Sequence, residues 1–173
     1  MNSCPTFALI LVIVTVVIQS VLIGTRFWGT QPTGLGGTPT PDKLVANSIG
    51  LFKSTYGSSV VNSSGKAKLA QTLSTSSLVL VVIAALLVAC LVAHRSTVPS
   101  CGVKTGSAVL VFVAFGVSLT ASIFNTRFIK GVTGKPPAKF GVAIALHYVS
   151  SFLLLPAFLL LWGGAQGNPA MSG

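Results

Sequence analysis

Carboxylates are almost absent from this chain: among its 173 residues, Asp42 is the sole acidic one. Pairs of carboxylates carry the acid–base chemistry of glycosidases and many other hydrolases, so those enzyme classes are excluded. Charged residues of both signs make up only 7% of the chain, whereas they make up about a quarter of a soluble globular domain. A soluble globular fold is therefore excluded as well.

Motifs of known catalytic and nucleotide-binding sites are also missing. The chain has no HExxH zinc motif, no CxxC pair and no P-loop. Its cysteines are Cys4, Cys90 and Cys101, and none lies in the longest loop, so we expect no disulfide framework. Cys4 and Cys101 flank membrane edges, where they are either plain thiols or sites of S-acylation. We therefore expect a protein that is not an enzyme.

Long apolar runs are what the chain does have. Four runs of eighteen or more residues contain no acidic, Lys or Arg side chain, and they cover residues 7–24, 77–94, 106–125 and 141–163. A membrane-spanning helix needs about 20 such residues. We predict an all-α, multi-pass integral membrane protein: an antiparallel bundle of four transmembrane helices that forms one domain over residues 1–173, with a long loop, 25–76, between the first two.

The loops differ in length and composition. Glycines and prolines in residues 29–41 argue against a regular helix or a central strand there. The apolar pattern of residues 43–52 predicts a short amphipathic helix on the membrane surface. Residues 66–76 are expected to continue directly into the second span as one longer helix. The short loops 95–105 and 126–140 make the last three spans antiparallel neighbours.

The cations are unevenly distributed between the two sides of the predicted bundle. Only Arg95 and Lys104 lie on the side of the termini, whereas nine lie on the side of loops 25–76 and 126–140: Arg26, Lys43, Lys53, Lys66, Lys68, Arg127, Lys130, Lys135 and Lys139. The positive-inside rule places this cationic side in the cytoplasm, or in the matrix or stroma of an organelle. Asn62 begins a glycosylation sequon, and a glycan on it would reverse this orientation.

The cationic loops also predict partners. Lys and Arg near a membrane surface bind anionic lipid headgroups, or they dock on acidic neighbouring subunits. For lipid or partner binding we name Lys43, Lys53, Lys66, Lys68, Arg127, Lys130, Lys135 and Lys139. The cations are scattered and have no interleaved aromatic residues, so nucleic acid is not an expected partner.

Small residues predict which helix faces pack together. Ala85, Ala89 and Ala93 recur every four residues in the second span, and Ala114, Ser118 and Ser122 do so in the third. Because transmembrane helices approach closely through small side chains, we expect these two stripes to face each other.

Two polar side chains stand out within the spans. His147 lies about 10 Å deep in the fourth span at 1.5 Å per residue, and three roles are open to it: a hydrogen bond to another helix, ligation of a pigment or haem, and a proton or substrate role. We name His147 as the candidate cofactor-binding residue, with no cofactor identified. Gln19 in the first span is explained by an interhelical hydrogen bond.

Several short stretches resemble an uncharacterised four-span membrane family of plants and bacteria, called domain of unknown function five-nine-nine. They are Thr30-Gln31-Pro32, Gln71-Thr72-Leu73, Arg127-Phe128, and Gly141 with Tyr148, Leu155-Pro156 and Leu161-Trp162-Gly163. The resemblance implies a four-helix membrane fold and no known activity.

A second resemblance is to the claudin-like tetraspan superfamily. Trp28 and Gly50-Leu51-Phe52 are similar to its W…G-L-W signature in the first loop. This resemblance implies a membrane-organising or adhesion protein whose first loop lies outside the cell.

Three functions therefore stay open. The first is a non-catalytic structural or accessory subunit of a larger membrane complex. The second is a small transporter or channel lined by Gln19, Ser118, Thr120 and His147. The third is the claudin-like adhesion protein. The sequence names neither the membrane nor the oligomeric state.

Overall fold

The computed structural model describes residues 4–25, 29–32, 46–49, 65–93, 101–132 and 139–166. Four long helices dominate it: α1 (Cys4–Gly24), α3 (Gly65–Ala93), α4 (Cys101–Val132) and α5 (Val142–Gln166). Three short strands accompany them: β1 (Gly29–Pro32), β2 (Ala46–Ile49) and β3 (Lys139–Phe140). Each helix is long and apolar enough to cross a membrane, so the predicted four-span, multi-pass membrane fold is confirmed.

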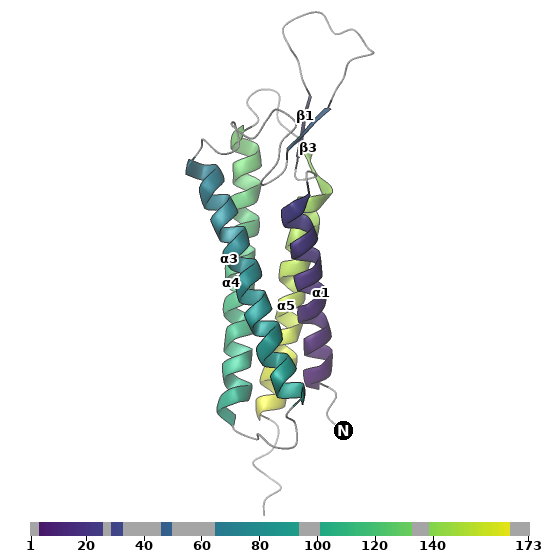
Figure 1. The fold of residues 1–173 in the computed structure, drawn as a ribbon, viewed down its shortest axis with the longest axis vertical. Helices are drawn as coiled ribbons and strands as arrows, with labels where there is room; N and C mark the ends of the chain where they lie inside the picture. The colour runs from purple at the N-terminus through teal and green to yellow at the C-terminus, as the bar shows by residue number, and fades with distance from the viewer. Residues whose placement is uncertain are drawn as a thin grey trace, which may run out of the picture.

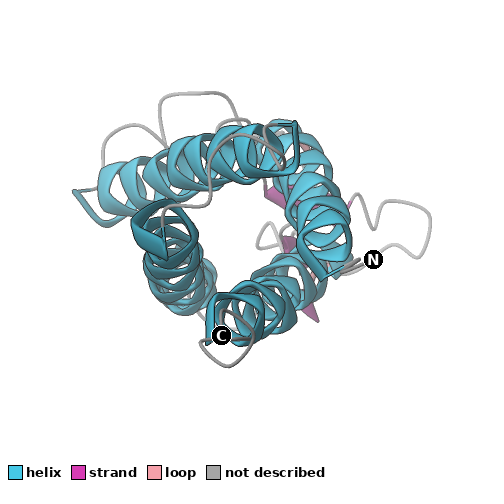
Figure 2. Ribbon diagram, turned by 90° about the horizontal axis from the view of Figure 1, so that it is seen from below, coloured by secondary structure: helices cyan, strands magenta, loops and turns pink. Residues whose placement is uncertain are grey.

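The four helices form a closed, antiparallel ring. α1 packs against α3 and α5, and α4 packs against the same two helices on the other side, as Figure 2 shows along the bundle axis. α3 begins at Gly65 and runs without a break into the second span, which confirms the longer helix expected from residue 66 onwards. α4 extends to Val132, seven residues beyond the predicted end of its span at residue 125.

Buried positions recur at alternating spacings of three and four residues along every helix. In α3 they are Ala70, Ser74, Ser77, Val81, Ala84 and Val88, and in α4 they include Val111, Ala114, Ser118, Ala121, Asn125 and Phe128. α1 and α5 repeat the pattern, for example at Ala8, Val12, Thr15, Gln19 and Leu22. This heptad spacing is the signature of a left-handed bundle with interlocking side chains.

A small antiparallel sheet lies at one end of the bundle, opposite the N-terminus (Figure 1). The strand order is β2-β1-β3, with Gly29 paired to both Ile49 and Phe140. Because β1 and β2 belong to the first loop and β3 to the third, backbone hydrogen bonds hold these two loops together. The sheet therefore marks the end of the bundle at which the cation-rich loops begin and end.

This sheet corrects two predictions from the sequence. Residues 46–49 form β2, so the amphipathic helix predicted over residues 43–52 is wrong there. β1 is a central strand within residues 29–41, where we had excluded one. The physical reason is the partial pairing of β1: β3 covers only Gly29 and Thr30, so Pro32 has a strand on one side only, as proline requires.

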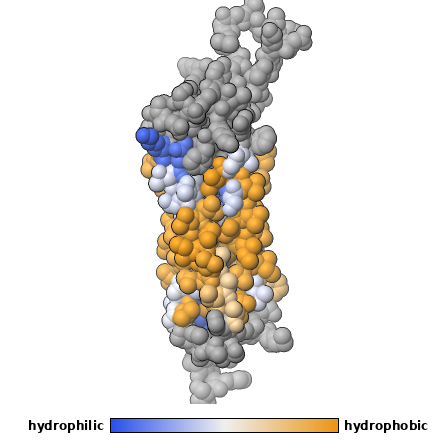
Figure 3. Space-filling model, viewed as in Figure 1, coloured by the Kyte–Doolittle hydropathy of each residue, from blue (hydrophilic) through white to orange (hydrophobic). Residues whose placement is uncertain are grey.

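The outer surface of the bundle is an apolar band between more polar ends. On the face that Figure 3 shows, orange residues cover the middle of the helices and blue residues lie toward the sheet end. Large side chains such as Phe7, Val79, Phe112 and Phe152 are about half exposed on it. Such a surface is stable in lipid and not in water. Trp162 is also exposed and packs against Phe158 near the end of α5.

Candidate functional site

A layer of polar side chains crosses the interior of the bundle, in the half of the helices nearer to the sheet. We call it the polar layer, and its buried members are Thr15, Gln19, Ser74, Ser77, Ser118, Ser122, Asn125, His147, Ser150 and Ser151. Every helix contributes to it. On α4 the layer runs from Ser118 to Asn125, which is about 10 Å at 1.5 Å per residue.

Gln19 connects three helices within this layer. Its Nε2 donates to Ser118 Oγ of α4 at 2.6 Å, and its Oε1 accepts from Ser77 Oγ of α3 at 3.3 Å. Gln19 is completely buried, so both ends of the amide are removed from water and bonded to protein. The predicted interhelical role of Gln19 is confirmed.

His147 is joined to a neighbouring helix in the same way. Its Nδ1 lies 2.6 Å from Ser122 Oγ of α4. The carbonyl of His147 accepts from Ser150 Oγ and Ser151 Oγ, both at 2.8 Å, on its own helix. The first of the three roles considered for His147, a hydrogen bond to another helix, is therefore observed.

Hydrogen bonds to backbone carbonyls give one consistent assignment of the protons of this network. Ser122 donates to the carbonyl of Ser118 at 2.9 Å, so its oxygen is left to accept the Nδ1 proton of His147. Ser151 donates to the carbonyl of His147, so it accepts from Ser118 Oγ at 2.6 Å. Ser118 in turn accepts from Gln19. In this assignment each hydroxyl donates one proton and the His147 ring carries its proton on Nδ1. The contact of 3.2 Å between Ser122 Oγ and Ser151 Oγ then has no proton of its own.

Asn125 is the member of the layer nearest to the end of α4. Its Nδ2 donates to Ser74 Oγ of α3 at 2.9 Å. Its Oδ1 is buried and has no hydrogen-bond partner among the residues that the structure describes. This contact ties α3 to α4 closer to the sheet than the bonds of Gln19 do, by about one turn on α3 and two turns on α4. Asn125 was not among the site residues predicted from the sequence.

Apolar side chains enclose the polar layer on both sides. Toward the termini, the core consists of residues such as Val12, Val81, Val88, Val111 and Leu154. Toward the sheet, the buried residues are Leu22, Ala70, Phe128, Ala143 and Ile144. The described helices therefore hold no polar lining that continues from one end of the bundle to the other.

The structure places only some of the residues predicted to line a transport path in the interior of the bundle. Gln19, Ser118 and His147 do meet in the interior, as that hypothesis required. Thr120 does not: it is exposed on the outer face of α4, and its hydroxyl donates to the carbonyl of Gly116. Its backbone-directed hydrogen bond explains how a threonine is accommodated on a lipid-facing surface.

The pigment or haem predicted at His147 stays a prediction. The side chain is 1% exposed and is held at Nδ1 by Ser122. A planar cofactor at this position would have to displace the core side chains around the ring. Among the residues that the structure describes, no group of three metal-ligating side chains occurs.

The small-residue stripe predicted on α3 needs correction. Ala93 is exposed, and Ala85 and Ala89 are only half-buried, whereas Ala84 and Val88 are buried. On α4, Ala114, Ser118 and Ser122 are buried. The two serines bond to α1 and α5. A spacing of four alone drifts around the helix, whereas the alternating spacing keeps to the interior.

The predicted lipid- and partner-binding cations lie at the sheet end where the structure describes them. Lys68 of α3 and Arg127 of α4 are exposed there. Lys66, Lys130 and Lys139 belong to α3, α4 and β3 at the same end. Lys43, Lys53 and Lys135 lie outside the described residues, as does Asn62.

The fold and its apolar surface define a multi-pass integral membrane protein of four helices. No protein-family model matches the chain, and no curated protein matches it either.

Proposed function

We propose that this protein is a non-catalytic structural or accessory subunit of a larger membrane complex, whose cationic end binds anionic lipid or acidic partners. The observation that carries the proposal is the sheet, because pairing of β1 with β2 and β3 joins the first and third loops. Nine of the eleven cations lie in these two loops or in the helix ends beside them. The polar layer supports it, because its side chains bond to one another inside the bundle.

Electrostatics give this end of the protein its expected affinity. Each Lys or Arg near an anionic surface contributes about 1 kcal/mol of attraction. Asp42 is the only acidic residue that could neutralise them from within the chain. The excess positive charge therefore remains available to headgroups or to an acidic subunit.

Purification in a mild detergent tests the proposal directly. We expect the protein to retain anionic phospholipid or an acidic membrane subunit, identified by native mass spectrometry. A protein that emerges as a bare monomer, with neither lipid nor partner and with no preference for added phosphatidylglycerol over phosphatidylcholine, would contradict it.

A charge variant refines this test. Lys68→Gln is expected to weaken phosphatidylglycerol binding about fivefold, because one cation near the surface contributes about 1 kcal/mol. Lys104→Gln is the matched control, since Lys104 lies near the start of α4 at the opposite end of the bundle. Equal losses of phosphatidylglycerol affinity in the two variants would show that the cationic end is not the binding surface.

One observation favours the claudin-like adhesion function as a second candidate. Trp28 directly precedes β1 and Gly50-Leu51-Phe52 directly follows β2 in the sequence. The two adjoining strand residues, Gly29 and Ile49, are paired across the sheet. The two halves of the W…G-L-F pattern are therefore adjacent in the sequence to two strand residues that pair with each other.

Membrane orientation distinguishes the two candidates. For the accessory subunit, we expect the first loop to be protected from protease added outside sealed cells and Asn62 to carry no glycan, because the positive-inside rule keeps that loop inside. Cleavage within the first loop in intact cells would favour the adhesion protein instead. In that case the C-terminus is protected in intact cells and is cleaved only after permeabilisation.

A further inference from the structure

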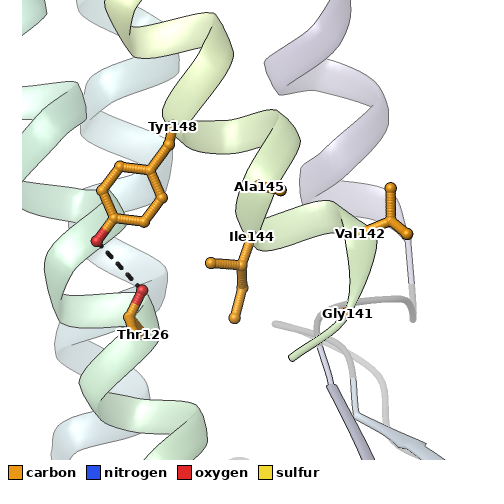
Figure 4. A pocket seen from close by; sticks show the side chains of 6 residues that line it. All are labelled: Thr126, Gly141, Val142, Ile144, Ala145 and Tyr148. Atoms are coloured by element: carbon orange, nitrogen blue, oxygen red, sulfur yellow. Dashed lines mark hydrogen bonds between the residues drawn. The ribbon is translucent and has the colours of Figure 1, made fainter. Parts of the chain in front are cut away.

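An open groove lies on the outside of the bundle, between α4 and the first turns of α5 (Figure 4). It has a volume of about 490 Å³, and we call it the α4–α5 groove. Pockets of this volume hold one drug-sized molecule. The groove is lined by Thr126, Gly141, Val142, Ile144, Ala145 and Tyr148.

The groove lies at the level where the helices enter the apolar part of the membrane. The span of α4 ends at Phe128, and that of α5 begins at Val142. The two helices are antiparallel and Ser122 Oγ is bonded to His147, so Thr126, one turn beyond Ser122, lies beside the first turn of α5. An occupant of the groove therefore lies where the headgroups of the lipids give way to their acyl chains.

The polar side-chain atoms of the groove are two hydroxyl groups whose protons are both used. Tyr148 Oη lies 3.3 Å from Thr126 Oγ1, as the dashed line in Figure 4 marks. Thr126 donates to the carbonyl of Ser122 at 2.9 Å, so Tyr148 is the donor between them. Both oxygens keep lone pairs that can accept a hydrogen bond. The side chains of the groove therefore accept hydrogen bonds and donate none to an occupant.

This arrangement selects among the lipids that could occupy the groove. The phosphate of a phospholipid only accepts hydrogen bonds, so it would face two oxygens with no proton between them. The ammonium of phosphatidylethanolamine does donate, but it lies farther out in the membrane than the phosphate, whereas the two hydroxyls lie at the edge of the apolar span. An apolar molecule with one hydroxyl at that edge matches both the depth and the hydrogen-bonding capacity.

We propose that the α4–α5 groove binds one sterol molecule, whose hydroxyl donates to the Tyr148–Thr126 pair and whose rings lie against Val142, Ala145 and the ring of Tyr148. A single rigid ring system suits one groove, whereas the two acyl chains of a diacylglycerol would compete for it. This site goes beyond the proposed function, because it requires no charge and involves none of the cations at the sheet end.

Filling the groove tests the site. Ala145→Trp and Val142→Trp each place an indole in it, and both side chains are exposed, so the helix is expected to tolerate the change. Leu146→Trp is the matched control, because Leu146 is also exposed on α5 but does not line the groove. Cholesterol binding to the detergent-purified protein is followed by native mass spectrometry. We expect it to be lost in the first two variants and kept in the control.

The hydrogen bond is tested with cholestenone, in which a carbonyl replaces the hydroxyl of cholesterol and no proton can be donated. The unchanged protein is expected to bind cholestenone about fivefold more weakly than cholesterol, as the loss of one hydrogen bond predicts. Tyr148→Phe removes one of the two acceptors. It is expected to weaken cholesterol binding by about the same factor and to leave cholestenone binding unchanged.

Each contrary outcome overturns a stated part of the proposal. Cholesterol binding that is absent from the unchanged protein, or equal in Ala145→Trp, Val142→Trp and the unchanged protein, overturns the site. Equal affinity for cholesterol and cholestenone overturns the role of the hydroxyl. Tighter binding of dioleoylglycerol than of cholesterol would make the occupant a diacylglycerol. The preference for phosphatidylglycerol that tests the proposed function is measured separately, so either can fail without the other.

Discussion

Ala84→Phe is expected to destabilise the bundle by about 1–3 kcal/mol, as overpacking of a closely packed interior does. Ala84 is completely buried on α3, within the apolar core that lies between the polar layer and the termini. A phenyl ring there would have to push α3 away from its neighbours. The free energy of unfolding, measured by titrating the protein in mixed micelles with sodium dodecyl sulfate, gives the effect.

The preceding residue supplies a matched control for this substitution. Ile83 is 43% exposed on the same helix and faces outward, so Ile83→Phe is expected to change the stability by less than about 0.5 kcal/mol. Ala84→Leu is a milder form of the interior change if the phenylalanine variant does not accumulate. Equal losses from Ile83→Phe and Ala84→Phe would show that α3 does not present the face described above.

The membrane spans could be predicted from sequence because one physical property decides them. Lipid excludes charge over about 30 Å, and the apolar runs satisfy that requirement without reference to any other part of the chain. The continuation of α3 back to Gly65 was also predictable, because residues 66–76 contain no proline or glycine to stop a helix. The spans and the start of α3 were therefore predicted correctly, because each depends on the composition of one segment alone.

Which face of each helix is buried was harder to predict, because inside a membrane both the buried and the lipid-facing side chains are apolar. In a soluble protein the polar face marks the outside, whereas here Ile83 and Ala84 are both apolar and only one is buried. The alternating three- and four-residue spacing of the polar residues would have predicted the buried faces. Thr15 and Gln19, Ser74 and Ser77, and Ser118, Ser122 and Asn125 all fall on the heptad faces that are buried.

The sheet could not be predicted from local sequence at all. Its strands contain residues such as Gly29, Pro32 and Asn47, which have low strand propensity. They form strands because the bundle brings the end of α1 close to the start of α5, where Gly29 meets Phe140. Pairing across more than a hundred residues of sequence overrides propensity once the helices have fixed the distance.

The polar layer could be predicted only in part, for a related reason. A serine or threonine in a span, taken alone, is satisfied by a hydrogen bond to its own helix, as Thr120 and Thr75 are. What distinguishes Ser118 and Ser122 is that His147, Ser151 and Gln19 lie at the same depth on facing helices. That coincidence of depth exists only after the bundle has formed.

Gln19→Leu is expected to cost about 1–3 kcal/mol of stability, because it removes two buried interhelical hydrogen bonds, each contributing up to about 1.7 kcal/mol in a membrane protein. Leucine has nearly the volume of glutamine, so the loss reports the amide and not a cavity. Ser118 and Ser77, the partners of Gln19 at 2.6 and 3.3 Å, are both left buried.

A double-mutant cycle with Ser118→Ala isolates the stronger contact of Gln19. The two substitutions together are expected to cost less than the sum of their separate effects by about 0.5–2 kcal/mol, because each already breaks the same bond. Ser20→Ala is the control, since Ser20 is exposed on α1 and bonds only to the carbonyl of Val16 in the described contacts. Additive losses from Gln19→Leu and Ser118→Ala would mean that the polar layer does not join α1 to α4, and its side chains would then not hold the bundle together.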